Sequence, residues 1–262
     1  MGVPIVQVDA FTDTPFRGNP AAVCVLETGR PAAWMQDVAR EMNLPETAFV
    51  EPGADGFGLR WFTPAVEVDL CGHATLASAH VLWETERLPP SAQARFHTRS
   101  GVLTAERCAS WIELDFPATP AAPVEAPAGL VAALGVTPKS VGRSAFDYLV
   151  EVDSEQTVRG LAPDLRALVR IDTRGVIVTA AADAAGHDFV SRFFAPRAGI
   201  DEDPVTGSAH CCLAPFWSAR LQRREMTGYQ ASARGGVVRV RIEGTRVKLG
   251  GQAVTVLRGE LA

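Results

Sequence analysis

Tyrosine is nearly missing from this chain, with 2 in 262 residues, and no run of lysine and arginine stands out along it. A nucleic-acid-binding surface needs clustered basic residues, often with aromatic side chains for base stacking, and the pair Arg223-Arg224 is too little for that. The formal net charge is -5. We therefore expect no nucleic-acid partner.

Long apolar runs are missing as well, since none approaches the roughly 18 residues that a membrane helix needs. The opening segment Met1–Phe11 has no basic stretch before its apolar residues, which favours a strand over a secretion signal. The five cysteines are an odd number without the spacing of a disulfide framework, and Cys211 and Cys212 are adjacent. These absences predict a cytoplasmic protein with reduced thiols and no membrane partner.

Two segments of the chain resemble each other, one from Arg60 to Trp83 and one from Arg192 to Trp217. Each reads arginine, aromatic residue, phenylalanine, any residue and proline. An acidic residue follows, and then a Gly-x-Ala turn that leads into an apolar stretch. We interpret this as an internal duplication with one copy in each domain, the alternative being chance similarity of short motifs.

The segment between the two copies is rich in proline and alanine, which predicts a semi-extended linker over residues 118–128. The domains are then residues 1–117 and 129–262, and it stays open whether the last strand returns to the first domain.

Short β-branched or aromatic segments bounded by glycine, proline or charge predict many strands. In the first half they cover residues 3–11, 21–26, 47–51, 57–62, 94–98, 102–107 and 111–116, and in the second half 147–152, 175–180, 188–194, 237–242, 246–249 and 253–258.

Three helices are predicted, over residues 32–42, 74–83 and 208–221. The last two are apolar almost all round, which is typical of buried helices. Pro215 predicts a kink or a restart in the third. The expected fold class is α+β, with two similar domains that each wrap a curved, mostly antiparallel sheet or barrel around a central helix.

The turns before the two buried helices contain Gly72 and Gly207. The first N–H groups of a helix have no partner within the helix, and glycine allows a ligand to approach the backbone closely. Such turns are anion sites, so the pair could hold a substrate carboxylate or a carbanionic intermediate. The alternative is that both glycines serve only as helix entry turns.

Titratable residues flank these turns. His73 lies in a first helical turn, which disfavours the imidazolium and predicts a neutral histidine, although it could also simply cap or pack there. Cys71 at the same helix start is expected to have a lowered pKa and could act as a base, or it could be a buried, inert thiol. Thr206 occupies the matching position in the second turn, which disfavours a symmetric two-thiol racemase.

Three further observations complete the set of candidates. Glu46 lies in an apolar loop, where a buried carboxylate would suit general acid–base chemistry and a solvated one would have no role. Asp203 precedes the second turn and could act chemically or as a helix cap, and His210 in that helix could be either catalytic or structural. No cluster of metal-ligating residues has a convincing spacing in the sequence, so no metal is expected.

Four motifs together resemble one known family. They are Val8-Asp9-Ala10-Phe11 with Gly18-Asn19-Pro20-Ala21-Ala22-Val23; Asn43-Leu44-Pro45-Glu46-Thr47-Ala48-Phe49; Asp69-Leu70-Cys71-Gly72-His73-Ala74-Thr75; and Glu202-Asp203-Pro204-Val205-Thr206-Gly207-Ser208-Ala209-His210. In this order and content they resemble the PhzF-like proteins of phenazine biosynthesis.

The resemblance implies the diaminopimelate-epimerase fold, with an active site between two similar domains, and a homodimer. It implies Glu46 as the catalytic acid/base, assisted by His73 and Asp203. It further implies substrate binding by Asn19, Gly72, Thr206, Gly207 and Ser208. No cofactor and no metal are implied.

The function expected from this resemblance is a cofactor-independent isomerase that moves a proton within a small carboxylate substrate, similar to dihydro-hydroxyanthranilate. Two alternatives stay open at this point. One is a one-thiol epimerase or dehydratase that uses Cys71, and the other is a non-catalytic protein that binds small anions.

Overall fold

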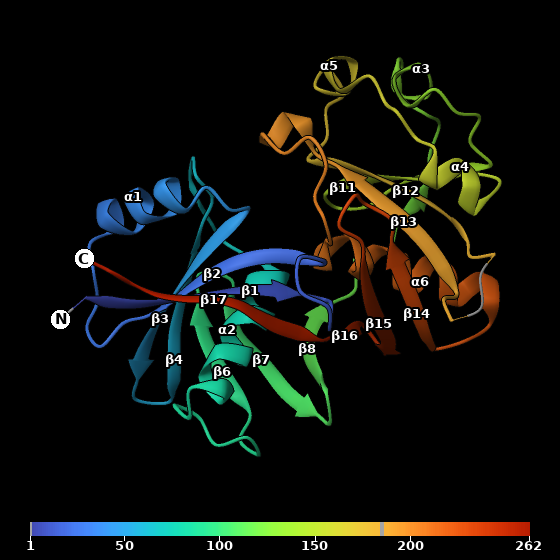
Figure 1. Cartoon of the computed structure of the whole chain (residues 1–262). Helices are drawn as coiled ribbons and strands as arrows, with labels where there is room; N and C mark the ends of the chain where they lie inside the picture. The colour runs from blue at the N-terminus through green and yellow to red at the C-terminus, as the bar shows by residue number, and fades with distance from the viewer. Residues whose placement is uncertain (1, 184–185) are drawn as a thin grey trace. The chain divides into compact units, whose positions relative to one another are not determined.

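The structure is a computed structural model that describes residues 2–183 and 186–262. Its backbone contacts divide the chain into two units. Unit 1 comprises Met1–Phe116 together with Gly250–Ala262, and unit 2 comprises Pro117–Leu249. The last strand, β17 (Ala253–Leu261), pairs antiparallel with β1 (Val3–Ala10), so both ends of the chain belong to unit 1 (Figure 1).

Strands make up most of each unit. Besides β1 and β17, unit 1 holds β2 (Asn19–Val25), β3 (Glu46–Gly53), β4 (Gly56–Phe62), β5 (Glu67–Val68), β6 (Ala94–Thr98), β7 (Gly101–Cys108) and most of β8 (Trp111–Pro117). Unit 2 holds β9 (Ala122–Pro123), β10 (Ser140–Arg143), β11 (Asp147–Glu151), β12 (Gly175–Ala181), β13 (Phe189–Phe194), β14 (Glu225–Gln230), β15 (Gly236–Glu243) and most of β16 (Arg246–Gly251).

Helices are fewer and mostly short. Unit 1 has α1 (Ala32–Met42) and α2 (Gly72–Glu84), and unit 2 has α3 (Leu130–Leu134), α4 (Glu155–Arg159), α5 (Leu165–Leu168), the 3₁₀ turn η1 (Pro196–Ala198) and α6 (Gly207–Leu221). In the part of the chain that the structure describes, no helix combines the length and the apolar character that crossing a bilayer would require.

The strands of the two units pair in the same order. In unit 1, β1–β2 is antiparallel, β2–β3 parallel, β3–β4 antiparallel, β4–β6 parallel and β6–β7 antiparallel. In unit 2, β10–β11, β11–β12, β12–β13, β13–β14 and β14–β15 repeat these five relations one for one. The long apolar helix comes after β4 and the short β5 in unit 1, and after β13 and the 3₁₀ turn η1 in unit 2. The predicted internal duplication is therefore confirmed.

The repeated arginine and acidic residue form the same ion pair in both units. Arg60 on β4 donates from Nε and Nη2 to the two carboxylate oxygens of Glu67, at 2.7 and 2.8 Å. Arg192 on β13 makes the same two bonds to Glu202, again at 2.7 and 2.8 Å. Each pair ties a strand to the segment that leads to the long helix. The acidic residue of the repeated motif is thus one half of a structural clamp. This gives Glu202 a structural role as the partner of Arg192.

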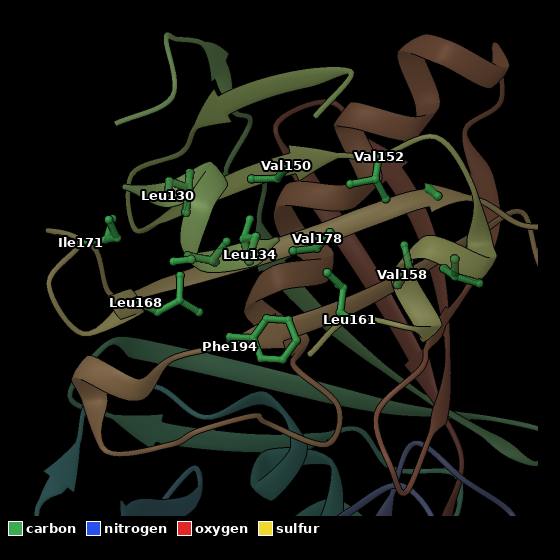
Figure 2. Packing of buried hydrophobic residues seen from close by; sticks show 14 residues of the cluster. Leu130, Leu134, Val150, Val152, Val158, Leu161, Leu168, Ile171, Val178 and Phe194 are labelled. Atoms are coloured by element: carbon green, nitrogen blue, oxygen red, sulfur yellow. The ribbon is translucent and has the colours of Figure 1, made fainter. Parts of the chain in front are cut away.

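Each unit packs one face of its sheet on a long helix and the other face on smaller elements. In unit 2, Val178 of β12 packs with Leu134 and Leu168 from α3 and α5 (Figure 2). The next residue of β12, Thr179, points to the opposite face, where its hydroxyl accepts a hydrogen bond from Trp217 of α6 at 3.0 Å. In unit 1, Phe49 of β3 packs in the same way with residues of α1.

Proline inside α6 does not end the helix, so of the kink or restart predicted at Pro215, the restart is wrong. Proline lacks an N–H group, which leaves the carbonyl of Cys211, four residues earlier, without its helical donor. The backbone N–H of Thr119 donates to that carbonyl at 3.1 Å. A segment far away in the sequence therefore completes the helix at its proline.

The same contact shows that the predicted linker over residues 118–128 is not free. Ala118 donates to the carbonyl of Thr245 at 2.9 Å, and β9 pairs antiparallel with β10 through Ala122 and Pro123. Proline is tolerated in a strand at a sheet edge, where its missing donor costs no ladder bond. Within the segment, Ala122 and Pro123 form a strand, and the segment is hydrogen-bonded to unit 2.

The elements that the sequence did not predict are short or interrupted. Helices α3, α4 and α5 have five, five and four residues, which is too short for a helical period to show. Strand β14 contains Gly228 at its centre, a residue that argues against a strand. A Cβ atom there would lie 2.5 Å from the ring of Phe189, so only glycine fits.

The clamp pairs lead to a stability prediction. Replacing Arg60 or Arg192 by methionine should lower the free energy of unfolding by about 2–3 kcal/mol, because a largely buried glutamate loses its bidentate partner. Arg40→Met is the control, since Arg40 and Asp37 form a pair with side chains 61% and 71% exposed and should contribute less than about 1 kcal/mol. Urea unfolding measures all three, and equal losses would contradict the clamp.

Candidate functional site

Both long helices begin at the predicted turns without a side-chain cap. The residues before them, Cys71 and Thr206, have extended backbones and make no side-chain capping hydrogen bond, and the Cys71 sulfur lies 3.5 Å from Nδ1 of the His73 ring. The first residues inside the helices are Gly72 and Gly207. The amide groups of each first turn are therefore not satisfied by the capping side chain, which is the arrangement that anion binding requires.

In unit 1, three predicted residues meet at the start of α2. Parallel pairing of β2 and β3 sets Glu46 beside Ala21, two residues after Asn19. Nε2 of His73 forms an ion pair with Oε2 of Glu46 at 3.2 Å, and Nδ1 of the same ring lies 3.2 Å from the Asn19 amide nitrogen. The side chains of His73 and Glu46 are only 5% and 12% exposed. The carboxylate is therefore largely buried rather than solvated.

The pKa of His73 is raised well above its usual value. Burial alone would lower it, but the negative charge of the Glu46 carboxylate and the hydrogen bonds to Glu46 and Cys71 outweigh that effect. The neutral histidine predicted from the helix N-terminus is therefore wrong. A carboxylate at 3.2 Å acts more strongly on the ring than the helix end does. In the neutral ring, Nδ1 accepts from Asn19, and in the imidazolium its nearest further partner is the Cys71 sulfur at 3.5 Å.

The Cys71 thiol does not have the lowered pKa expected at a helix start. Burial raises its pKa first, and the nearby charge of Glu46 raises it further, while His73 acts in the opposite direction. At neutral pH the group is therefore a thiol, and the carboxylate of Glu46 is the charge that faces the histidine. This argues for the inert alternative and against a thiolate base.

Glu46, Cys71 and His73 also bring three potential metal-ligand atoms within 4.8 Å of one another. The sequence did not predict this cluster, because Glu46 comes from a different strand. The two acceptors lie at different ring nitrogens of His73, with sulfur at Nδ1 and carboxylate at Nε2. One atom from each residue could therefore ligate a metal ion, and the same three groups could also exchange protons through the ring of His73.

In unit 2, Asp203 and Thr206 are joined through a buried glutamine. The Thr206 hydroxyl donates to Oδ2 of Asp203 at 2.5 Å, and the Thr206 backbone N–H donates to Oε1 of Gln230 at 2.9 Å. Gln230 donates in turn to the Asp203 carbonyl and to the Thr206 hydroxyl, at 2.8 and 3.2 Å. This network fixes the loop before α6, and Asp203 is 8% exposed at its end.

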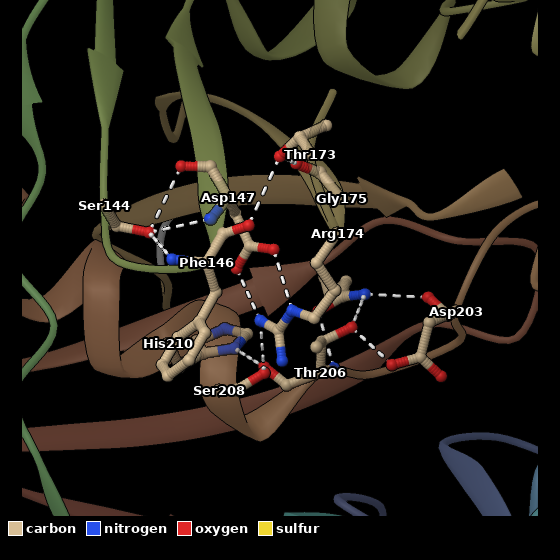
Figure 3. A network of polar contacts seen from close by, with 11 residues as sticks. Ser144, Phe146, Asp147, Thr173, Arg174, Gly175, Asp203, Thr206, Ser208 and His210 are labelled. Atoms are coloured by element: carbon tan, nitrogen blue, oxygen red, sulfur yellow. Dashed lines mark hydrogen bonds and ion pairs between the residues drawn. The ribbon is translucent and has the colours of Figure 1, made fainter. Parts of the chain in front are cut away.

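Ser208, in the first turn of α6, is held by an arginine from another element (Figure 3). Nη2 of Arg174 donates to the Ser208 hydroxyl at 3.0 Å. The same guanidinium makes a bidentate pair with Asp147, at 2.9 and 2.5 Å, and Asp147 is 1% exposed. Ser208 is thus positioned by a buried carboxylate through the arginine.

His210 has a structural role. Burial lowers its pKa to about 4, so the ring is neutral at pH 7, and Nδ1 lies 2.8 Å from the Thr206 carbonyl, to which it donates. Among the described residues, Nε2 has no hydrogen-bond partner. Gly228 leaves space for the ring, since a Cβ there would lie 3.2 Å from Nε2.

Asp147, Arg174 and Gln230 were missed by the sequence analysis. Gln230 lies on β14, which was not predicted, and no local pattern marks it. Asp147 is the first residue of β11 and Arg174 directly precedes β12, and a charged residue beside a buried strand is the signal that could have identified them.

The chain matches the family model described as phenazine biosynthesis-like protein over residues 8–259. It belongs to that family. A relative from Halalkalibacterium halodurans named an uncharacterized isomerase is 55% identical, and the alignment covers 100% of this chain and 99% of the relative. A crystal structure of a PhzF family protein from Enterococcus faecalis has a TM-score of 0.96 and 41% identity, with 100% of both chains covered.

Outside the PhzF family, this chain is similar to other solved structures in its fold alone. A probable proline racemase from Agrobacterium radiobacter is 12% identical with a TM-score of 0.67, over 99% of this chain and 93% of that one. The predicted α+β class of the diaminopimelate-epimerase type is confirmed, and so is an isomerase of the PhzF type as the enzyme class.

The depressed pKa of His210 leads to a prediction about stability and pH. In the unfolded chain the group titrates near 6.5 and in the folded protein near 4, so between these values the unfolded state binds more protons. Stability from this group is complete above pH 6.5 and falls by about 3 kcal/mol as the pH drops to 4.

The test is His210→Asn, whose side-chain amide can keep the bond to the Thr206 carbonyl but cannot titrate. Urea unfolding followed by tryptophan fluorescence at pH 7, 6, 5 and 4 should show a flatter pH dependence in the variant. Parallel curves for both proteins would show that His210 is not the group responsible.

Proposed function

We propose that the protein is a cofactor-independent isomerase in which Glu46 removes a proton from one carbon of a small carboxylate substrate and returns it to another. The observation that carries this is the largely buried pair of Glu46 and His73, with 3.2 Å between carboxylate and imidazole. A buried carboxylate without competing water is a suitable general base. Membership of a family whose relatives are named isomerases supports the reaction class.

In the proposed step, one C–H bond breaks and its proton goes to the Glu46 carboxylate, while the electron pair stays on the substrate. The amide groups of the first turn of α2, at Gly72 and His73, stabilise the developing charge. Glu46 then delivers the proton to a different carbon, and a double bond shifts in between. Protons and electrons balance within one molecule, so no external acceptor is needed.

We propose that the turn of unit 2 binds an anionic group of the substrate. Support comes from its uncapped first turn at Gly207 and from Ser208, whose hydroxyl is held by Arg174. Asp203 orients the substrate from the preceding loop. The substrate class is a small carboxylic acid similar to dihydro-hydroxyanthranilate, and a cytoplasmic homodimer remains a prediction from the family resemblance.

A one-thiol mechanism through Cys71 receives less support. Its pKa is raised, it is 6% exposed, and the residue at the matching position in unit 2 is Thr206. A protein that only binds anions would need no buried carboxylate beside a histidine, so Glu46 argues against that alternative.

Deuterium incorporation tests the proposal. The protein is incubated in D₂O with dihydro-hydroxyanthranilate and with a panel of amino acids and cyclic carboxylic acids, and each product is examined by NMR and mass spectrometry. We expect Glu46→Gln to lower isomerisation or exchange by about 10²–10⁴-fold, because the variant keeps the shape of the side chain and loses the base.

Glu51→Gln is the matched control, since Glu51 lies on the same strand, β3, and should retain wild-type exchange. If Glu46→Gln keeps full exchange, Glu46 is not the base. If exchange survives in Glu46→Gln but disappears in Cys71→Ala, the thiol mechanism is correct instead.

A further inference from the structure

A hollow on unit 2 is lined by three arginines. It has a volume of about 400 Å³, and its lining includes Arg143, Phe146, Asp172, Thr173, Arg174 and Arg197. We call it the arginine hollow. It includes none of the residues that the sequence predicted, but Arg174 belongs both to its lining and to the network that holds Ser208.

Arg174 is fixed in place before any ligand arrives. Two of its nitrogens are bound by Asp147, and its guanidinium lies 5.0 Å from the ring centre of Phe146 and 5.7 Å from that of Phe193. Among the described residues, its remaining nitrogen, Nη1, has no hydrogen-bond partner. An arginine held in this way loses little conformational entropy when it binds an anion.

The charge of the hollow is not balanced. Asp147 is already paired with Arg174. Asp172 pairs with Arg197 at 3.0 Å, and the Asp172 side chain is 95% exposed. Arg143 instead donates to the backbone carbonyl of Asp172 at 3.0 Å and stacks on a tyrosine ring. Three cations therefore face two carboxylates, which leaves one positive charge for a ligand.

The rim of the hollow is apolar at one point. The Phe146 side chain is 48% exposed although it is large and hydrophobic, and it borders the guanidinium of Arg174. An organic anion with a flat or cyclic body could place its acidic group on the arginines and its body on this ring. An inorganic anion would make no use of the ring.

We propose that the arginine hollow is a specificity site that takes an acidic group of the substrate lying away from the reacting carbon. This rests on the proposed function in one respect, that the turn at Gly207 and Ser208 contacts the substrate. Arg174 connects the two places, because it lines the hollow and donates to Ser208. The enzyme would therefore prefer cyclic or aromatic acids over neutral analogues of the same shape.

The test is an NMR titration of the full-length protein with benzoate, and with benzamide as the neutral analogue. Benzoate should shift the backbone amide signals of Phe146, Thr173 and Ala198 around the hollow, and benzamide should bind at least about tenfold more weakly. Added salt should weaken benzoate binding, because part of the hollow is exposed.

Removing two charges locates the site. The double variant Arg143→Gln with Arg197→Gln should weaken benzoate binding at least about tenfold, while Arg166→Gln, on the exposed face of α5, should leave it unchanged. Both replaced arginines are exposed or partly exposed, so we expect the fold to persist. Equal binding of benzoate and benzamide, or benzoate binding unchanged in the double variant, would overturn the proposal.

The two proposals fail in different ways. If Glu46→Gln loses exchange but benzoate binding does not depend on the arginines, the isomerase proposal stands and the proposal for the arginine hollow fails. If Glu46→Gln keeps full exchange but benzoate binding depends on the arginines, Glu46 is not the base and the arginine hollow is still an anion site.

Discussion

A helix buried on all sides must still begin somewhere, and its first turn carries amide groups that the helix itself cannot satisfy. This constraint acts twice in the chain, at Gly72 and at Gly207. Both helices begin without a side-chain cap, and the surrounding sheet leaves them no polar face. Each unit places its polar and titratable side chains around that first turn. The duplication therefore repeats a fold together with a pair of positively polarised helix ends.

The two copies then differ in the groups placed beside the turn. The buried acid Asp147 of unit 2 has an arginine partner, and so do the clamp residues Glu67 of unit 1 and Glu202 of unit 2. Arginine keeps its proton at every physiological pH, so these pairs are structural. Glu46 faces His73 instead, and histidine gains and loses a proton near neutrality. Among these four paired acids, only Glu46 has a partner that can gain and lose a proton near neutral pH.

Much of this could be predicted from the sequence, since apolar periodicity and the repeated Arg-aromatic-Phe-x-Pro pattern mark α2, α6 and the duplication. The protonation states at the α2 turn could not be predicted from the sequence, because they depend on which side chains a parallel strand pairing brings together. Helix position alone favoured a neutral His73 and an acidic Cys71. The contact of His73 with Glu46, 27 residues away, together with burial, reverses both. Arg174 and Asp147 were missed for the same reason, since their partners come from different strands and from α6.

Glu46 and His73 form a coupled, proton-exchanging pair in the proposed mechanism. The most direct measurement is a ¹⁵N NMR titration of the histidine side chains, with His73 assigned by its loss in His73→Gln, in the wild type and in Glu46→Gln. We expect an imidazolium at pH 7 in the wild type, with a pKa above 6.5. In the variant the pKa should fall below that value, because burial then acts without the carboxylate. A His73 that is neutral at pH 7 in both proteins, with the same pKa, would contradict it.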